Sequence, residues 1–433
     1  MAETYQERSG NGGVSRREFL GSATLTAAGV ATGLSFYFSR PQRRDYSELE
    51  MPVNQVRLGY IGVGNRGGSL LRSSLQAPGC RPVAVADVRS TQRDEFVAKI
   101  REESPVAKKE SESTKKAYQV HAYADYRRLL DRKDVEGVII ATPHYLHGPM
   151  AIDALEAGKH VYCEKAMAYT VGENQDLYNM VAKLRGRVFQ VGHQRRYSPL
   201  YQKVKEMVDG GALGDIAALR AQWNQKNVER RACPDPALEK VVNWRLYSEF
   251  SGGLATEFAS HQVDVANWIL GTHPDSVCGY GGVDWYRDGR DTFDNIHLIF
   301  NYKVPAVERD EYGRVRQDTN GQPVTVKEEG RTLLRDVRFT YTSMMQNDHL
   351  GPSEMILGTR GSIEVCLSGG GEYFIQPSAQ LELAALEAAQ DAKKKGASSP
   401  RKAVKAGATI GASCLKRKKG ELIEVHKDKG HWS

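Results

Sequence analysis

Short runs rich in apolar residues alternate with helical stretches through the first part of the chain. The runs are Val56–Ile61, Pro82–Ala86, Val138–Ala141 and His160–Cys163, and the helical stretches lie near residues 68–76, before residue 102 and over 148–157. Runs of this kind are typical of strands buried on both faces of a sheet. Their β-α-β order predicts an α/β fold, with a parallel sheet and crossover helices, which we assign to residues 51–170.

From about residue 188 the pattern changes to longer strands of alternating character. Ile216–Trp223 and Asn295–Phe300 are examples, and such alternation indicates an antiparallel sheet with one face covered. Residues 302–331 are polar and rich in turn residues, which predicts a long surface hairpin or loop. We therefore predict a second, α+β domain with a largely antiparallel sheet over residues 171–378.

The net charge of +7 comes from the end of the chain. Residues 391–433 contain twelve Lys or Arg against four acids, whereas residues 1–50 contain six of each sign. The rest of the chain is close to neutral, which argues against a nucleic-acid groove because such a groove needs clustered basic groups. We interpret residues 379–433 as a solvated, Ala/Lys-rich basic tail, with an arm for nucleic acid or lipid as the alternative.

Residues 1–50 have the pattern of an export signal followed by a linker. Arg16 and Arg17 precede an uncharged stretch of 21 residues, Phe19–Ser39, in the order of a twin-arginine signal. This predicts a protein of the periplasm or cell envelope, and the stretch is long enough to act as a membrane anchor. The alternative is a disordered basic N-terminus on a cytoplasmic protein.

The six cysteines indicate neither a metal site nor a disulfide framework. Their spacings include no Cys-x-x-Cys and no zinc pattern, and a protein that folds before export acquires its structure reduced. We expect buried cysteines that pack as small apolar side chains, and no bound metal.

A glycine-rich turn joins the first predicted strand to the first predicted helix. It reads G-x-G-x-x-G, and its candidate cofactor-binding residues are Gly62, Gly64, Asn65, Arg66 and Gly67. The glycines permit a tight turn and close approach to a pyrophosphate, and the helix N-terminus supplies donors for the phosphates. Asp87, twenty residues after Gly67, suits the ribose hydroxyls of NAD, while Arg89 leaves NADP open. The turn predicts a Rossmann domain that binds a dinucleotide.

Several ordered motifs resemble the glucose-fructose oxidoreductase and inositol dehydrogenase (Gfo/Idh/MocA) family. They are Ala141–His147, Ala154–Lys165, Leu213–Ile216, Ser251–Gly253 with Glu257, His261 and Asp264, and Gly358–Ile363, within residues 56–365. The resemblance implies a Rossmann domain followed by an open-faced sheet domain through which subunits form a homo-oligomer. It also implies that NAD or NADP binds at the strand ends, with a carbohydrate substrate between the domains.

Carried over by position, the resemblance places Lys165 beside the nicotinamide and the substrate oxygen. His261 becomes the proton donor or acceptor, and Glu257 stands where the family often has Asp. The residues that line the nicotinamide ribose are then Thr142, Pro143, His144, His147 and Glu164.

The chemistry of alcohol oxidation requires the same types of residue. A base must take the hydroxyl proton, and a cation stabilises the developing alkoxide, roles that suit His261 and Lys165. Glu257, His261 and Asp264 are spaced i, i+4 and i+7, so a helix would place them on one face, where a carboxylate can orient the imidazole. Lys165, His261 and Glu257 are our catalytic candidates. The alternative is that His261 and Asp264 only cap or cross-link a helix and that Lys165 is an ordinary surface lysine after a strand.

Two residues depart from the family pattern. The family's Glu-Lys-Pro is Glu164-Lys165-Ala166 here, and a cis peptide bond before a residue other than proline costs about 3 kcal/mol. We therefore expect a different backbone after Lys165. His144 stands where Asn is common, which changes the group that faces the nicotinamide ribose.

Aromatic, Arg and Asn side chains provide candidate walls for a sugar pocket, because rings stack on sugars while Arg and Asn bind hydroxyls or carboxylates. The candidates are Arg195, Tyr197, Asn243, Trp244, Arg245 and Asp264, and structural packing is open for each. The leading hypothesis is an exported oxidoreductase with tightly bound NAD(P) that acts on a sugar, cyclitol or polyol. The alternatives are a glycoside hydrolase or lyase that uses transient ring oxidation, and a non-catalytic NAD-bound carbohydrate-binding protein.

Replacing Arg16 and Arg17 by Lys tests the export signal. We expect the double variant to stay in the cytosol, because the translocase for folded proteins reads the arginine pair. Cell fractionation measures the outcome, and the same exchange at Arg43 and Arg44 in the linker is the matched control. Normal export of the Arg16/Arg17 variant by that translocase would contradict the signal.

Overall fold

The computed structural model describes residues 34–36, 55–77, 79–103, 119–226, 230–233, 235–310, 315–319, 323–366 and 370–375. The predictions for the basic tail, and for residues 1–50 apart from the short strand β1 (Leu34–Phe36), lie outside this part of the chain. Within it, no helix combines the length and the apolar character needed to cross a bilayer.

The first domain is built on a parallel sheet. In order across the sheet, its six described strands are β4 (His121–Tyr123), β3 (Cys80–Ala86), β2 (Val56–Ile61), β5 (Gly137–Ile140), β6 (His160–Glu164) and β7 (Phe189–Gly192). The predicted Rossmann domain is confirmed. Its predicted end at residue 170 is too early, because β7 pairs parallel with β6. β7 is short and only partly buried, so its pattern resembles the start of the next domain.

Helices cover both faces of this sheet. They are α2 (Asn65–Leu75), α3 (Ser90–Glu103), α6 (Tyr126–Leu130), α7 (His147–Glu156) and α8 (Val171–Lys183). Neighbouring residues of one strand enter different cores: Tyr60 packs with α2 and α3, and Ile61 packs with α6, α7 and α8. This two-sided burial explains why the strands are apolar runs rather than alternating sequences.

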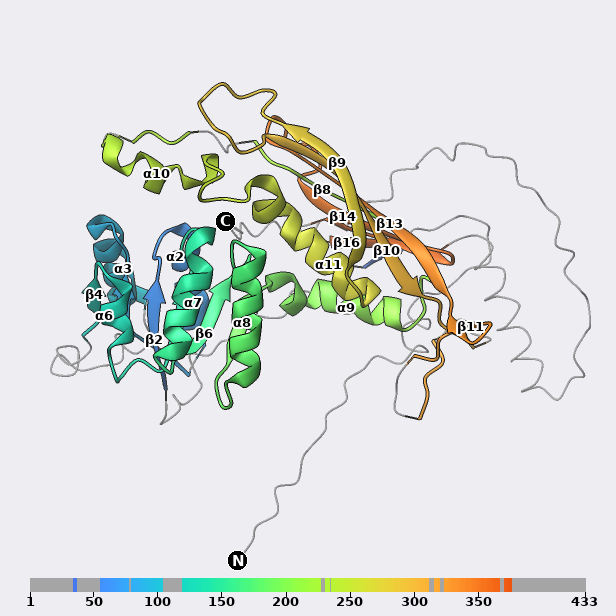
Figure 1. Ribbon diagram of the computed structural model, residues 1–433, viewed down its shortest axis with the longest axis horizontal. Coiled ribbons are helices and arrows are strands. Elements are labelled where there is room, and N and C mark those ends of the chain that lie inside the picture. Colours follow the sequence, from blue (N-terminus) through green and yellow to red (C-terminus); the bar gives the residue numbers. More distant parts are fainter. Residues whose placement is uncertain are drawn as a thin grey trace, which may run out of the picture.

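The second domain is a large mixed sheet with helices on one face (Figure 1). In spatial order the described strands are β1, β16 (Gly370–Ile375), β15 (Gly361–Cys366), β14 (Pro352–Gly358), β8 (Ile216–Asn224), β13 (Leu334–Met344), β10 (Asn295–Pro305) and β9 (Pro274–Gly282). Only β8 and β13 pair in parallel among these, so the predicted mostly antiparallel sheet is confirmed.

Two helices bury the inner face of the second sheet. α9 (Pro199–Asp209) and α11 (Ser260–Leu270) pack with inward strand residues such as Phe300, Phe339 and Ile356 in one core. A long segment that contains α10 (Glu239–Val242) leaves this core and extends above α2 and α3 (Figure 1). The second domain therefore reaches over the carboxyl-end side of the first.

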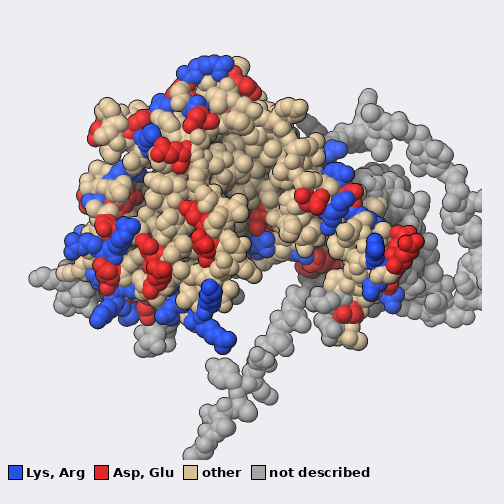
Figure 2. All heavy atoms as spheres, in the orientation of Figure 1, with Lys and Arg blue, Asp and Glu red and all other residues tan. Residues whose placement is uncertain are grey.

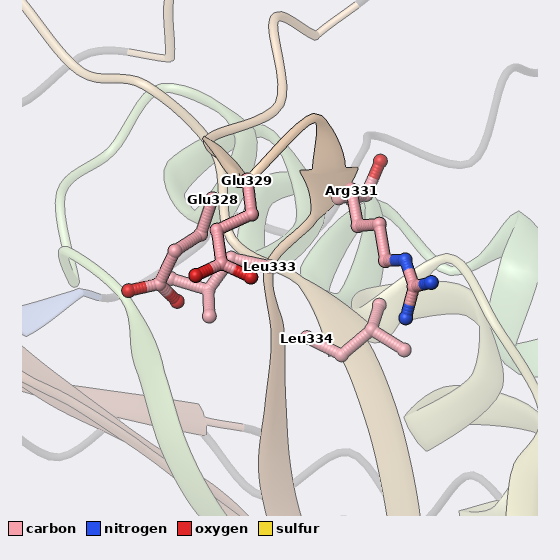
Figure 3. A pocket seen from close by; sticks show the side chains of 6 residues that line it. Glu328, Glu329, Arg331, Leu333 and Leu334 are labelled. Carbon is pink, nitrogen blue, oxygen red and sulfur yellow. The ribbon is translucent and has the colours of Figure 1, made fainter.

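The polar segment after β10 forms a narrow hairpin, as predicted. Isolated bridges such as Val307–Thr325 lead to β11 (Lys327–Glu328) and β12 (Arg331–Thr332). An open hollow at this tip is lined by Glu328, Glu329, Arg331, Thr332, Leu333 and Leu334, and Figure 3 shows the two carboxylates on one side with Arg331 turned away. None of the site residues predicted from the sequence lines this hollow.

The surface and the cysteines are only partly as expected. On the face shown in Figure 2, acidic and basic side chains are interspersed, and no broad basic patch gathers there. The described cysteines are free, but only Cys163 is fully buried and Cys278 is exposed, so the expectation of buried cysteines is wrong in general. Cys278 lies on β9, an edge strand whose side chains no helix covers.

A buried ion pair fixes the start of the second domain to its sheet. Arg195 is 4% exposed and donates to Glu354, which is 5% exposed and also accepts from the Tyr201 hydroxyl at 2.7 Å. The pair joins η3 (Gln194–Tyr197), α9 and β14. The Arg195 guanidinium also lies over the rings of Tyr201 and Trp223, at 5.4 and 5.6 Å from their centres.

Glu354→Leu should destabilise the fold by about 3–5 kcal/mol, because it leaves the Arg195 charge buried without its partner. The double variant Arg195→Met, Glu354→Leu should recover much of this loss, since it removes both charges. Urea unfolding of the three proteins measures the effect. Equal stability of the single variant and the wild type would contradict a structural role for the pair.

Candidate active site between the two domains

The glycine-rich turn has the shape that a dinucleotide requires. Gly62 has φ +81°, and a Cβ there would lie 2.7 Å from the backbone of Ala141 and Thr142. A Cβ on Gly67 would lie 2.4 Å from the carbonyl oxygen of Gly62, so α2 can pack against the strand only with glycine. Gly64, the N-cap of α2, provides no side-chain cap, which leaves the first N–H groups available to phosphate oxygens.

Asp87 links this turn to the end of β3. One carboxylate oxygen accepts from the Val63 N–H at 3.0 Å, and the other accepts from the Arg89 N–H at 2.9 Å. Each oxygen keeps a lone pair, so the carboxylate can still accept from ribose hydroxyls. The predicted NAD-binding residue therefore also orders the turn that would hold the phosphates.

Lys165 follows β6 and reaches across to the second domain. Its ammonium donates to the carbonyl oxygens of Glu257 at 2.7 Å and Thr256 at 3.3 Å, in the π-helical turn η6 (Ala255–Ala259). Burial lowers the pKa of Lys165, while the charges of Glu257 and Glu164 partly oppose that change. The peptide bond Lys165–Ala166 is cis, so the expectation of a different backbone at Ala166 is wrong.

Glu257 is the acidic centre of the site. Burial alone would raise its pKa, but Arg245, Lys165 and His144 lower it to about 2, so it is ionised at neutral pH. Arg245 Nε donates to one carboxylate oxygen at 3.0 Å, and His144 Nε2 lies 3.2 Å from the other. Burial lowers the pKa of His144 to about 3, which keeps this imidazole neutral. His144 and Glu257, which stand where the family often has Asn and Asp, thus lie beside each other.

Among the residues that the structure describes, His261 has no carboxylate partner, contrary to the expected arrangement. Its ring stacks on Trp223 at 5.3 Å between centres, and Trp223 stacks on Phe258 at 4.8 Å. The π-helical turn has more residues per turn than an α-helix, so the i, i+4 spacing of Glu257 and His261 does not align them. Burial, and then the charge of Lys165, lower the pKa of His261 well below 6.5. It is neutral at pH 7 and can accept a proton.

Asp264 lies near a different histidine from the one expected. It binds Arg196 through two nitrogens, at 2.9 and 2.8 Å, and lies 3.6 Å from Nδ1 of His193. Burial and the charge of Lys165 lower the pKa of His193, and burial and the charge of His193 lower the pKa of His261. The sequence marks His193 only as part of a possible pocket wall, in the run Gly192–Tyr197, and assigns it no role in proton transfer. The available signal was its position directly after β7, at the carboxyl end of a parallel strand, where α/β proteins bind ligands.

His147 and Glu164 brace the site from the first domain. The two ring nitrogens of His147 contact the carbonyl oxygens of Ala166 and Thr142, at 2.7 and 2.9 Å, and the ring is 1% exposed. These contacts fix the segments on which Lys165 and Thr142 lie, whereas the prediction had His147 lining the ribose. Glu164 pairs with Arg66 at 2.8 Å, which ties β6 to the first turn of α2.

The predicted substrate residues divide into two groups. Trp244, Arg245 and Asp264 lie with the cluster around Lys165, since Trp244 packs edge-on against His144 at 5.2 Å. Arg195 is instead paired with Glu354 in the core. Asn243 is 4% exposed and binds the backbone of Arg231, while Tyr197 is 62% exposed. Residue type alone did not distinguish a pocket wall from a structural Arg or Asn.

Buried polar atoms around Lys165 lack partners in the described part of the chain. They are Thr142 Oγ1, His144 Nδ1, His193 Nδ1 and Glu257 Oε1, the last being near His144 without hydrogen-bond geometry. An unsatisfied buried polar atom costs about 1–3 kcal/mol, so clusters of them point to a missing polar ligand. Together with the glycine-rich turn, these atoms fit a nicotinamide dinucleotide and a hydroxyl-rich substrate.

Two family descriptions match consecutive parts of the chain. Residues 56–193 match "Oxidoreductase family, NAD-binding Rossmann fold", and residues 201–329 match the "GFO/IDH/MocA C-terminal domain". The first description names NAD, which confirms the cofactor predicted for the glycine-rich turn. Both domains thus have family counterparts in the predicted order.

Similar proteins include dehydrogenases and a glycoside hydrolase. The chain is 32% identical to levoglucosan dehydrogenase of Pseudarthrobacter phenanthrenivorans over 55% of this chain and 57% of that one. It is 31% identical to glycosyl hydrolase family 109 protein 2 of Shewanella sp. strain ANA-3, over 56% and 53%. The chain therefore spans somewhat more than half the length of these relatives. The solved structure of myo-inositol 2-dehydrogenase from Lactobacillus plantarum shares the fold, with TM-score 0.53, 19% identity and coverage of 72% and 76%.

Asp87→Asn tests the contact with the adenosine ribose. The amide oxygen still accepts from a backbone N–H, but the charge that strengthens a ribose hydrogen bond and repels a 2′-phosphate is lost. We expect NAD affinity to fall about tenfold, as for loss of one charge-assisted hydrogen bond, while NADP affinity falls less or rises. Titration with NADH and NADPH, followed by the fluorescence of the reduced nicotinamide, measures both affinities. An unchanged ratio of the two affinities would assign cofactor choice to another residue.

Proposed function

Because the chain belongs to the GFO/IDH/MocA family of oxidoreductases, we propose that it transfers hydride between NAD and a sugar, cyclitol or related polyol. The observation that carries this proposal is the position of Lys165. Its ammonium lies between the first domain and the π-helical turn, with a neutral imidazole and unpaired polar atoms around it. This combination provides a cation, a base and hydrogen-bonding groups at one place.

In this mechanism His261 accepts the hydroxyl proton of the substrate. Its neutral state at pH 7 leaves a ring nitrogen able to do so, and stacking on Trp223 restricts the ring plane. Lys165 stabilises the negative charge that develops on the same oxygen. The charge of Glu257 favours the protonated lysine, and its carboxylate accepts a hydrogen bond from Arg245. NAD, when bound, supplies the hydride acceptor.

A second candidate function is redox-assisted cleavage of a glycoside. Elimination beside an oxidised carbon removes a proton from carbon, so it needs a further proton-transfer group. His193, which faces Asp264, is a second imidazole close to Lys165 and suits that role. The similarity to a protein named as a glycosyl hydrolase supports the same candidate. Simple oxidation remains our first choice because it requires only His261 and Lys165.

We also propose that the protein is exported and forms homo-oligomers through its sheet. The paired arginines at 16 and 17 support export, and a cofactor bound during folding would leave the cytosol with the protein. On the sheet face opposite α11, Tyr280 is 89% exposed and Ile299 is 46% exposed. Covering such apolar side chains in a subunit contact would remove them from water.

Lys165→Ala and His261→Ala should retain the fold and bound nucleotide while turnover falls about 10²–10⁴-fold each, the usual range for electrostatic and acid–base groups. Turnover is measured on a panel of sugars and cyclitols through nicotinamide absorbance. Lys183→Ala and His273→Ala, at exposed positions, are matched controls.

Because oxidation requires neutral His261 and the pKa of His261 is well below 6.5, wild-type activity should not decline near pH 6.5 as the pH falls.

The same assay separates the competing functions. Release of an aglycone without net change in nicotinamide, accompanied by exchange of a substrate C–H with solvent deuterium, would favour glycoside cleavage. Undiminished sugar binding by both variants, with no turnover by the wild type, would contradict an enzyme and leave a carbohydrate-binding protein.

A further inference from the structure

The imidazole of His261 lies against an indole ring of β8. The rings of His261 and Trp223 are 5.3 Å apart between centres, with 27° between their planes. Trp223 is itself held in place, because its Nε1 donates to Gln225 at 2.9 Å and its carbonyl oxygen accepts from the Ser343 hydroxyl at 2.6 Å. A group that restrains this indole therefore also restrains the ring plane of His261.

Arg195 contacts two neighbours of His261, one in space and one in the chain. Its guanidinium carbon lies 5.6 Å from the centre of the Trp223 ring, within the range of a cation–π contact. Gln262 follows His261 in α11 and is 1% exposed. In the amide orientation that satisfies both of its polar atoms, its oxygen accepts from Arg195 Nη2 at 3.2 Å and its nitrogen donates to the Phe258 carbonyl at 2.7 Å. One guanidinium thus restrains His261 through two residues.

Stability alone does not account for the buried charge of Arg195. The guanidinium is paired with Glu354, and apolar side chains of similar volume commonly give equal or greater stability than a buried ion pair. The pair does fix a planar group whose five N–H donors can serve a carboxylate and an amide while its face covers an aromatic ring. Burial, the charge of Lys165 and then that of Arg195 lower the pKa of His261, which helps to keep the imidazole neutral.

The residue after Arg195 holds the same helix further along. Arg196 donates to the Asp264 carboxylate through two nitrogens, at 2.9 and 2.8 Å, and Asp264 lies three residues after His261 in α11. Both arginines belong to η3, which follows directly after β7 of the first domain. Because the first domain would hold the nicotinamide, η3 ties the base in the second domain to the cofactor domain.

We propose that Arg195 is a positioning residue for His261. Paired with Glu354, its guanidinium holds Trp223 and Gln262, and through them it fixes the orientation of the imidazole that accepts the substrate proton. The inference rests on the proposed function, because that function assigns proton acceptance to His261. It replaces the predicted role of Arg195 as a pocket wall.

The test uses two variants of the full-length protein with ¹³C-labelled histidine. Arg195→Lys keeps the charge beside Glu354 but loses the planar fork, and the double variant Arg195→Met, Glu354→Leu removes both charges. In each we expect the ring signals of His261 to shift, since stacking on Trp223 changes, and kcat to fall about 10- to 100-fold, the cost of a displaced reacting group. KM and NAD affinity should stay at the wild-type value. His261→Asn identifies the signals by their loss.

The matched control is the double variant Glu308→Leu, Arg316→Met, which removes an exposed ion pair of the hairpin and should change neither the signals nor kcat. Wild-type ring signals or wild-type kcat in either folded Arg195 variant would overturn the positioning role. So would a loss of kcat that is matched by a loss of NAD affinity, because it indicates a general disturbance of the fold. Shifted signals in a protein whose wild type turns over no sugar or glycoside would overturn the proposed function, while the hold of Arg195 on the imidazole stands.

Discussion

Lys165 places a positive charge at the junction of two domains, where burial removes much of its hydration. The cost is offset by two carbonyl oxygens of the π-helical turn, those of Thr256 and Glu257. In a regular α-helix such carbonyls accept from N–H groups four residues on, whereas the π-helical turn changes that pairing. The same turn carries Glu257, so one local irregularity of the second domain both solvates the lysine and supplies its counter-charge.

This electrostatic arrangement determines the protonation states around the lysine. Glu257 is held ionised by Arg245 and Lys165, while His144 and His261 are held neutral by burial. Positive charge is thus concentrated on Lys165 and Arg245, and the imidazoles remain available as hydrogen-bond acceptors or bases. His144 also lies beside Glu257, so two of the positions that depart from the family pattern are neighbours in space. A longer acid and a ring nitrogen meet where the family commonly has Asp and Asn.

The sequence predicted well those features that depend on local pattern. β2 begins and ends at the predicted residues, and the glycines of the dinucleotide turn are required by close backbone contacts. The order of the domains followed from the change in hydrophobic periodicity. Predictions failed where distant contacts decide the outcome. Arg195 pairs with Glu354, which is 159 residues away in the sequence. His261 does not meet its expected partner because of a π-helical turn that the sequence pattern did not indicate.

Lys165 also joins the two domains at this centre, because it follows β6 of the first domain and donates to the turn of Glu257 in the second. A ligand that contacts both the lysine and this turn can make all of its contacts only when the two domains are together. A ligand shifts a conformational equilibrium by its difference in affinity for the two states, so such a ligand would favour the arrangement in which Glu257 and His261 lie beside Lys165.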